Sequence, residues 1–94
     1  MRDDDFEWDD RKAAANLARH GVSFDEARLA FSDPFAAGRE DRREDFGEHR
    51  HILLGMADGR LLHVAYALRG ERVRIISARL AETRERRRYH ESNG

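Results

Sequence analysis

The sequence predicts an α+β domain with two N-terminal helices, a three- to four-stranded antiparallel sheet and a C-terminal helix, the helices being packed on the sheet. Helix-forming residues framed by capping signals fill the first third of the chain. Three apolar or alternating segments then follow in close succession, separated by short turn signals, and a charged helix-forming segment ends the chain. Strands joined in sequence by tight turns form antiparallel pairs, and helices cover the apolar face of such a sheet.

The 94 residues are expected to form one domain, spanning residues 1–94. Charged residues make up 39% of the chain, above the usual ~25%, and hydrophobic residues also make up 39%. That composition alone is compatible with disorder. Because the apolar residues recur with helix and strand periods, we interpret the chain as a folded domain with a heavily charged surface.

The first helix is expected at about residues 10–20. Asp9 or Asp10 is a suitable N-cap, and Gly21 stands where a C′ glycine ends a helix. The residues that share one face of this helix are Ala13, Leu17 and His20.

A second helix is expected at about residues 24–32. Ser23 and Glu26 fit a capping box, and Asp33-Pro34 stops the helix. The residues expected to point inward are Phe24, Ala27, Ala30 and Phe31.

Three strands follow an expected exposed loop at residues 40–47. Asp58-Gly59 and Gly70-Glu71 mark the two turns between them. The expected strands are residues 50–56, 60–69 and 72–79, with a possible edge strand at 35–39 and a possible short strand that places Phe6 and Trp8 on one side.

Period-two alternation assigns the faces of these strands. His63 alternates with inward residues and is expected to be exposed on the other face of the sheet. Ile76 is expected on the face opposite to that of Ile75 and Ser77. The shared faces are Leu62, Val64, Tyr66 and Leu68 in the second long strand, and Val73, Ile75 and Ser77 in the third.

The charge is distributed unevenly although the net charge is −1. Residues 1–48 carry 8 basic and 14 acidic groups, a net of −6, whereas residues 49–94 carry 10 basic and 5 acidic groups, a net of +5. Of the 18 basic residues 17 are arginine, which genomic base composition would also explain. Since arginine matches phosphate geometry, the basic half is a candidate nucleic-acid surface.

The last helix, expected at about residues 80–91, carries the first cluster of candidate functional residues. One interpretation is a solvated helix held by ion pairs. The functional interpretation is an arginine-lined surface for phosphates, with Tyr89 available to stack on a base or to move a proton. The candidate residues form one stripe, which begins where the preceding strand ends and consists of Arg79, Glu82, Arg86, Tyr89 and His90.

The segment GEHRH, residues 47–51, is the second cluster. Glu48, His49 and Arg50 could serve as base, acid and anion stabiliser, although a charged strand start is the alternative interpretation. A zinc site is conceivable, but neither cysteine nor an H-x-x-x-H pattern supports it, so we expect no metal. The histidines in question are His49, His51 and His63.

Other signals narrow the class of protein. The acidic N-terminus lacks the apolar stretch of a signal peptide, and no apolar run approaches the ~20 residues of a membrane span, so we expect a cytoplasmic protein. There is no cysteine, no Gly-rich phosphate loop and no nucleophile elbow. His20, at the end of a helix, is expected to cap or pack rather than to catalyse.

A set of short motifs extends over roughly residues 6–91. Their joint order and spacing resembles the BrnT family of toxins from bacterial type II toxin–antitoxin systems. The motifs are F-E-W-D-x-x-K (Phe6–Lys12), Asn16, H-G-V-S-F-D-E-A (His20–Ala27), F-S-D-P (Phe31–Pro34), G-E-H-R (Gly47–Arg50), Gly55, R-I-I-S-A-R (Arg74–Arg79) and E-R-R-R-Y (Glu85–Tyr89).

The resemblance implies a RelE-like fold and metal-independent RNA cleavage that inhibits translation, without a cofactor. It also implies a cognate BrnA-type antitoxin with a ribbon-helix-helix DNA-binding part, joined to the toxin in a heterotetramer. Operator DNA would be contacted only through the antitoxin.

RNA cleavage without a metal uses the 2′-hydroxyl as the nucleophile, so the protein must supply a base, an acid and cations. We hypothesise that Arg50 and Arg79 hold the phosphate oxygens and that Glu48 or Tyr89 is the base, Tyr89 needing guanidinium groups to lower its pKa. The residues assigned to RNA binding are Lys12, His49, Arg74 and Arg86.

Two other hypotheses compete with the ribonuclease. The basic C-terminal face could bind nucleic acid or an acidic partner without catalysis, or its arginines could serve only an antitoxin interface. RNA that stays intact while it shifts in a gel would favour the non-catalytic binding module.

Overall fold

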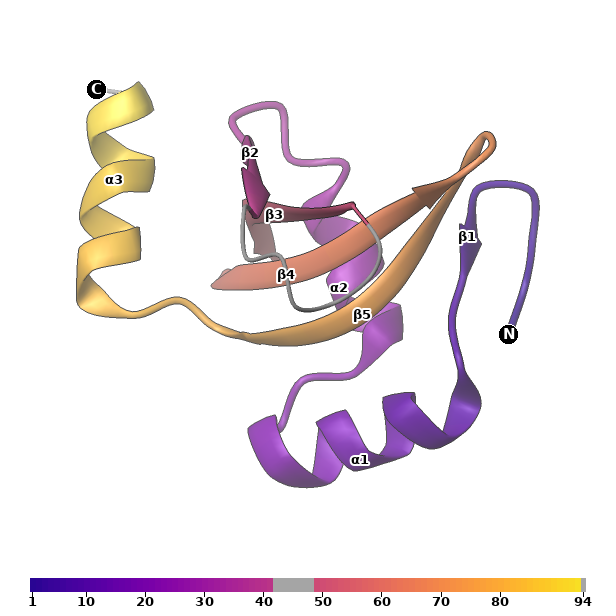
Figure 1. The fold of residues 1–94 in the computed structure, drawn as a ribbon. Helices are drawn as coiled ribbons and strands as arrows, with labels where there is room; N and C mark the ends of the chain where they lie inside the picture. Colours follow the sequence, from indigo (N-terminus) through magenta and orange to yellow (C-terminus); the bar gives the residue numbers. More distant parts are fainter. Residues whose placement is uncertain (42–48, 94) are drawn as a thin grey trace.

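The computed structural model describes residues 1–41 and 49–93, which form a five-stranded mixed sheet and three helices (Figure 1). The strand order is β1-β5-β4-β3-β2, so the predicted α+β class is confirmed. The elements are β1 (Phe6–Glu7), α1 (Asp10–His20), α2 (Phe24–Ala30), β2 (Ala37–Asp41), β3 (Arg50–Ala57), β4 (Arg60–Arg69), β5 (Arg72–Leu80) and α3 (Thr83–Asn93).

The first helix forms where its capping signals predict. The Asp9 carboxylate accepts hydrogen bonds from the N–H groups of Arg11 (2.8 Å) and Lys12 (3.2 Å), and Gly21 ends α1 in the left-handed conformation at φ 69°. The buried residue of α1 is Asn16, whereas Leu17 is 51% exposed. A polar residue therefore anchors this helix to the sheet.

The second helix is shorter than predicted. Ser23 Oγ accepts the Glu26 N–H at 2.9 Å, as a capping box requires, but α2 ends at Ala30 and continues only as a tight turn through Phe31 and Ser32. The inward residues of α2 are Phe24, Ala27 and Ala30, as predicted.

The expectation of three to four antiparallel strands is wrong in one respect. The strands β2, β3, β4 and β5 pair antiparallel, but β1 adds a fifth strand that runs parallel to β5 in the register Phe6↔Val73. A two-residue strand is too short to show its pairing partner in the sequence. It is held by the Val73 N–H, which donates to the Asp5 carbonyl at 2.8 Å.

The turns and strand bounds otherwise agree closely with the prediction. Asp58 and Gly59 have φ values of 48° and 81°, so the β3–β4 hairpin closes with the primed turn that this dipeptide favours. The edge strand β2 lies at Ala37–Asp41 rather than 35–39. Leu80 belongs to β5, so the last helix begins later than predicted, at Thr83.

The predicted faces of β5 are corrected by a bulge. Ile75 lies opposite Tyr66 and Ser77 opposite Ala65, so Ile76 is an extra residue in β5. Ile75 and Ala78 consequently both belong to the buried core, and Ser77 turns to the other face of the sheet. The predicted shared face of Val73, Ile75 and Ser77 therefore breaks at Ile76.

The two faces of the sheet are covered differently. α2 packs its apolar side on the face that carries Leu53, Leu62 and Val64, forming the main core. A smaller buried cluster on the opposite face joins Leu54, Leu61, Ala81 and Tyr89, and through it α3 docks at one end of that face. α3 stands well away from β1 (Figure 1). Among the described residues no helix has the length and apolar character to span a membrane.

Candidate active site

An open cleft of about 850 Å³ lies on the sheet face opposite α2. Strands β2, β3, β4 and β5 supply its floor, the C-terminus of α1 supplies one wall, and the first turn of α3 supplies another. The lining residues are Arg19, His20, Arg39, Asp41, Arg50, Ile52, His63, Ala65, Ser77, Ala78, Arg79 and Glu85.

The cleft has an excess of cationic side chains. Its lining includes four arginines but only two carboxylates, Asp41 and Glu85. A concave surface with this balance attracts anions, and its low-dielectric floor strengthens that attraction. The cleft therefore suits a phosphate-bearing ligand.

Arg79 reaches the cleft because of the bulge at Ile76. Strict alternation from Ile75 would have directed Arg79 into the core, whereas the extra residue restores it to the cleft face. Its guanidinium donates to both oxygens of Glu85, at 2.8 and 2.9 Å, and to the Leu80 carbonyl at 3.1 Å. The ion pair is a planar bidentate fork that fixes the orientation of the guanidinium.

His63 lies directly across from Arg79 in the β4–β5 register. The expectation that it is exposed is wrong, since its side chain is only 12% exposed and its Nε2 is 3.5 Å from Glu85 Oε2. Burial, followed by the charge of Arg79, lowers the pKa of His63, and the Glu85 carboxylate opposes this only in part. Its Nδ1 is buried and has no hydrogen bond to another described residue. The lowered pKa favours the uncharged imidazole at neutral pH.

The structure brings together two of the four residues assigned to catalysis. Arg50 and Arg79 both line the cleft, Arg50 from the start of β3 and Arg79 from the end of β5. Glu48 lies outside the described residues. Tyr89 does not line the cleft: it is 6% exposed in the small cluster beneath α3.

The pKa expected for Tyr89 is wrong in direction. Its hydroxyl donates to Asp33 Oδ2 at 2.6 Å. Burial and this contact with a carboxylate raise the pKa of Tyr89 to about 12, because both disfavour the phenolate. Among the described residues, Asp33 and burial dominate the pKa of Tyr89, and the hydroxyl fastens α3 to the segment after α2.

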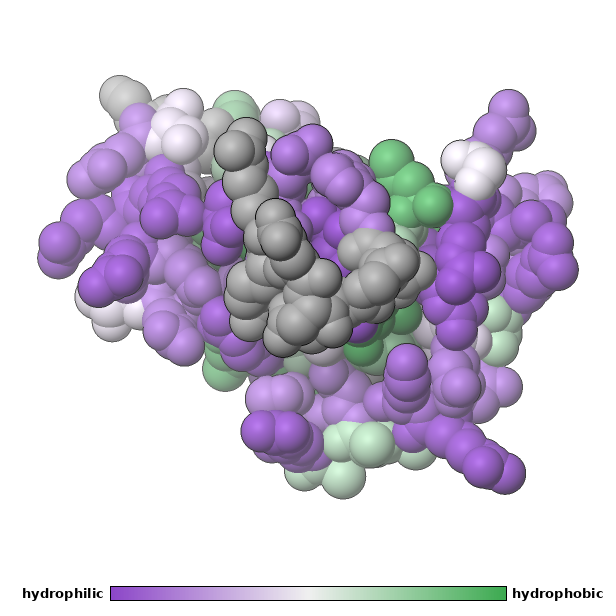
Figure 2. Space-filling view, in the orientation of Figure 1, coloured by the Kyte–Doolittle hydropathy of each residue, from purple (hydrophilic) through white to green (hydrophobic). Residues whose placement is uncertain are grey.

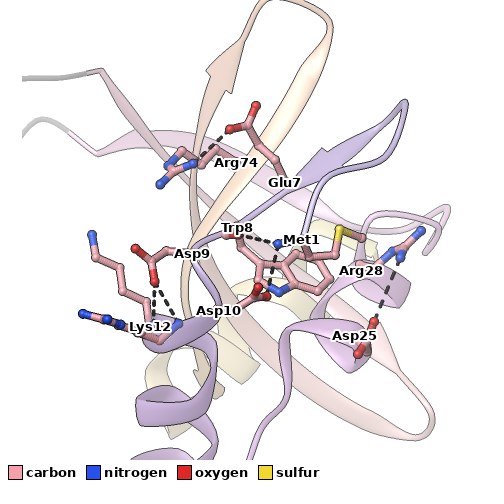
Figure 3. A network of polar contacts seen from close by, with 10 residues as sticks. Met1, Glu7, Trp8, Asp9, Asp10, Lys12, Asp25, Arg28 and Arg74 are labelled. Atoms are coloured by element: carbon pink, nitrogen blue, oxygen red, sulfur yellow. Dashed lines mark hydrogen bonds and ion pairs between the residues drawn. The ribbon is translucent and has the colours of Figure 1, made fainter.

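The residues assigned to RNA binding lie outside the cleft. Arg74 pairs with Glu7 across β5 and β1 at 2.9 Å, on the side of the molecule that Figure 3 shows, and Lys12 projects from the first turn of α1 nearby. His49 is exposed and its Nε2 is 3.1 Å from Glu40 Oε1, and Arg86 is exposed on α3.

The histidines considered for zinc are divided between two faces of the sheet. The rings of His49 and His51 are 4.9 Å apart, as their spacing predicts, and His51 stacks on Tyr66. His63 points to the other face, into the cleft. Within residues 1–41 and 49–93, no group of three or more potential ligands is placed to hold a metal ion.

The sequence did not reveal six of the charged or titratable residues that line the cleft, which are Arg19, His20, Arg39, Asp41, His63 and Glu85. The order of the strands places Arg39 beside Ile52 on the cleft face. The alternation of the strand predicted which face of the sheet His63 occupies. No local feature of the sequence predicted that α3 folds back beside His63, so the position of Glu85 could not be predicted.

The family of the chain is shown by a match that covers most of its length. Residues 8–85 match the family described as the ribonuclease toxin BrnT of type II toxin–antitoxin systems. A search of curated proteins finds no match. The matched region includes all the lining residues of the cleft, from Arg19 to Glu85. The chain therefore belongs to the BrnT family of ribonuclease toxins.

Proposed function

We propose that the chain is a metal-independent endoribonuclease and that the cleft is its active site. The observation that carries the proposal is that His63 lies directly across from Arg79 in a cationic cleft that Arg50 also lines. A proton acceptor beside fixed guanidinium groups is what RNA cleavage through the 2′-hydroxyl needs.

The proposed reaction is an in-line transfer within one strand of RNA. His63 takes the proton of the 2′-hydroxyl, whose oxygen bonds to the adjacent phosphorus while the bond from phosphorus to the 5′-oxygen breaks. The leaving 5′-oxygen takes a proton from His20, which lines the cleft at the end of α1. The products are a 2′,3′-cyclic phosphate and a free 5′-hydroxyl.

Arg79 and Arg50 stabilise the negative charge on the non-bridging oxygens in this scheme. The contacts of Arg79 with Glu85 and Leu80 use three of the five guanidinium N–H groups, which leaves two to donate to phosphate. Because Glu85 has already ordered the guanidinium, little side-chain entropy is lost when phosphate binds.

The decisive experiment is digestion of a defined single-stranded RNA by purified protein in the presence of EDTA. We expect cleavage products that end in a 2′,3′-cyclic phosphate. His63→Ala and Arg79→Ala should each lower kcat by about 100-fold or more, and Arg79→Lys should not restore the rate because lysine lacks the fork.

The leaving-group role of His20 has its own test. An RNA analogue with a 5′-thiolate leaving group needs little protonation, so His20→Ala should cleave it nearly as fast as the native protein while remaining slow on ordinary RNA. His63→Ala should be slow on both. Equal defects of His20→Ala on both substrates would remove the acid role.

The cellular role follows from the family as a proposal. Cleavage of RNA would inhibit translation in the cytoplasm, and a BrnA-type antitoxin would neutralise the toxin in a heterotetramer that contacts operator DNA through the antitoxin. Co-expression of that antitoxin should restore growth that the toxin alone stops. RNA that is bound but left intact would instead support a non-catalytic binding module.

A further inference from the structure

Two further hollows adjoin the cleft and extend it along α3. One of about 540 Å³ shares Arg39 and Glu85 with the cleft, and the next, of about 170 Å³, shares Arg39 and Arg88 with the first. Together they form a groove between β2 and α3, which we call the β2–α3 groove. The floor of the smaller hollow is apolar and is formed by Leu54 and by Ile52, which also lines the cleft.

Three arginines line the β2–α3 groove. Arg84 and Arg88 are one helical turn apart on α3, so they point to the same side, and Arg39 faces them from β2. The carboxylates that also line the groove, Glu82 and Glu85, are engaged by Arg79 at 3.7 and 2.8 Å.

These three arginines differ in their partners from the four described arginines that are held in carboxylate pairs. Arg28, Arg60, Arg74 and Arg79 each pair with a carboxylate. In the described part of the chain, Arg84 and Arg88 have no ion pair, and Arg39 has only a 3.4 Å hydrogen bond to the Glu40 carbonyl. The side of the molecule where α3 lies is predominantly hydrophilic (Figure 2).

We propose that the β2–α3 groove binds the nucleotides that flank the scissile linkage on one side, with Arg39, Arg84 and Arg88 holding successive phosphates of single-stranded RNA. The proposal rests on the ribonuclease activity of the adjoining cleft. We assign RNA to the groove because the groove continues the cleft. An RNA strand whose scissile phosphate lies at Arg79 extends out of the cleft on two sides, and one of them leads past Glu85 and Arg39 into the groove.

A single strand fits this groove better than a duplex. In-line attack requires the attacking and leaving oxygens to lie on opposite sides of the phosphorus, which the regular geometry of an A-form helix does not allow. The apolar floor at Ile52 and Leu54 suits an unpaired base, while the arginines at its rim can bond to phosphate or stack on the base.

Binding and cleavage can be separated in the test. The binding probe is a fluorescent 2′-O-methyl RNA of about 10 nucleotides, which fills the groove but lacks the nucleophilic hydroxyl. Its anisotropy is measured for the native protein, Arg84→Ala, Arg88→Ala and the control Arg87→Ala. Each variant removes one positive charge from α3. Arg87 is the control because it is on the same helix but lines none of the three hollows.

We expect Arg84→Ala and Arg88→Ala each to raise Kd by about tenfold and to reduce the dependence of log Kd on log salt by about 0.7, the value for one phosphate contact on a single strand. Arg87→Ala should change Kd less than twofold. In cleavage assays, the two groove variants should raise KM for a long RNA but leave kcat/KM for a dinucleotide unchanged, because a dinucleotide does not reach the groove.

Groove variants that bind the probe as Arg87→Ala does would overturn the proposal, even if the protein cleaves RNA. Variants that keep RNA affinity but escape neutralisation by the antitoxin would also overturn it and would assign the groove to a protein partner. Normal groove binding by a native protein that cleaves nothing in EDTA would contradict the proposed activity alone.

Discussion

Arg79 and Glu85 form a bidentate ion pair that joins the end of β5 to the first turn of α3, with N–O distances of 2.8 and 2.9 Å. The same carboxylate accepts the Glu82 N–H at 2.8 Å and lies 3.5 Å from His63 Nε2. One side chain thus orders the guanidinium, satisfies a donor at the helix N-terminus and influences the charge of the imidazole. Two predictions follow from these separate effects.

Glu85→Gln should shift the acidic limb of the pH profile of kcat/KM to lower pH. Burial and the Arg79 charge lower the pKa of His63, and the Glu85 charge raises it in part, so removing that charge lets the pKa fall further. We expect a shift of up to about one pH unit, since a single neighbouring charge contributes on this scale. The control is Glu82→Gln, which removes a carboxylate that is not among the groups that shift the pKa of His63. A limb that stays in place in Glu85→Gln would show that His63 is not the base.

Glu85 should also make stability depend on pH below its ordinary pKa. Burial raises its pKa, but hydrogen bonds from Arg79 and the Glu82 N–H, with nearby positive charge, outweigh this and lower the pKa from 4.5 to about 2. A lowered carboxyl pKa stabilises the fold fully above pH 4.5, and the contribution disappears as the pH falls through about 2. The full shift corresponds to about 3 kcal/mol, and screening by solvent reduces the contribution to roughly 1–2 kcal/mol.

Urea denaturation at pH 7 and at pH 2.5 measures this contribution. At pH 7 the native protein should be more stable than Glu85→Gln, and at pH 2.5 the difference in the free energy of unfolding should largely vanish. A difference that is the same at both values would mean that the ion pair does not stabilise the fold.

The sequence predicted the elements well because their signals are local. Asp9 and Ser23 are caps whose partners lie within three residues, and the Asp58-Gly59 turn requires only its own backbone angles. The parallel pairing of β1 with β5 joins residues far apart in the sequence through only two residue pairs, Phe6↔Val73 and Glu7↔Arg74, so no local pattern specifies it.

The cleft was predicted only in part, because the order of the strands and the packing of α3 bring residues together that no local pattern joins. Period-two alternation fails at Ile76, and this bulge directs Arg79 into the cleft opposite His63. An apolar run such as Ile75-Ile76 gives no sign of a bulge. Tyr89 lies outside the cleft for another reason: it is one of the few apolar residues in α3, and it packs with Leu54, Leu61 and Ala81.

Tyr89→Phe should reduce stability but not RNA cleavage. The substitution removes the 2.6 Å hydrogen bond to Asp33, which also accepts the N–H groups of Phe35 and Met56, while the buried ring remains. A hydrogen bond to a charged acceptor contributes about 1.5–3 kcal/mol. Thermal unfolding and RNA cleavage are measured on the same preparation. A well-folded Tyr89→Phe protein with no activity would restore the catalytic role that its burial argues against.

Asn16→Ala should destabilise the protein even though alanine is the better helix former. The buried Asn16 amide donates to the carbonyls of Val22 (2.9 Å) and Ala78 (2.8 Å), and its oxygen accepts the Ala78 N–H at 3.1 Å. It thus pairs with the edge of β5 as a neighbouring strand would. Three buried backbone groups would lose their partner, at a cost of about 3–5 kcal/mol, against a helix-propensity gain below ~1 kcal/mol.

The matched control for Asn16→Ala is Leu17→Ala, which truncates a larger but half-exposed side chain on the same helix. Urea denaturation should show a shift of less than about 1 kcal/mol for Leu17→Ala. Because Ala78 immediately precedes Arg79, Asn16→Ala should also lower RNA cleavage more than global unfolding explains, by loosening the strand that positions the guanidinium. If Asn16→Ala proved as stable and as active as Leu17→Ala, the amide would not be what holds β5 against α1.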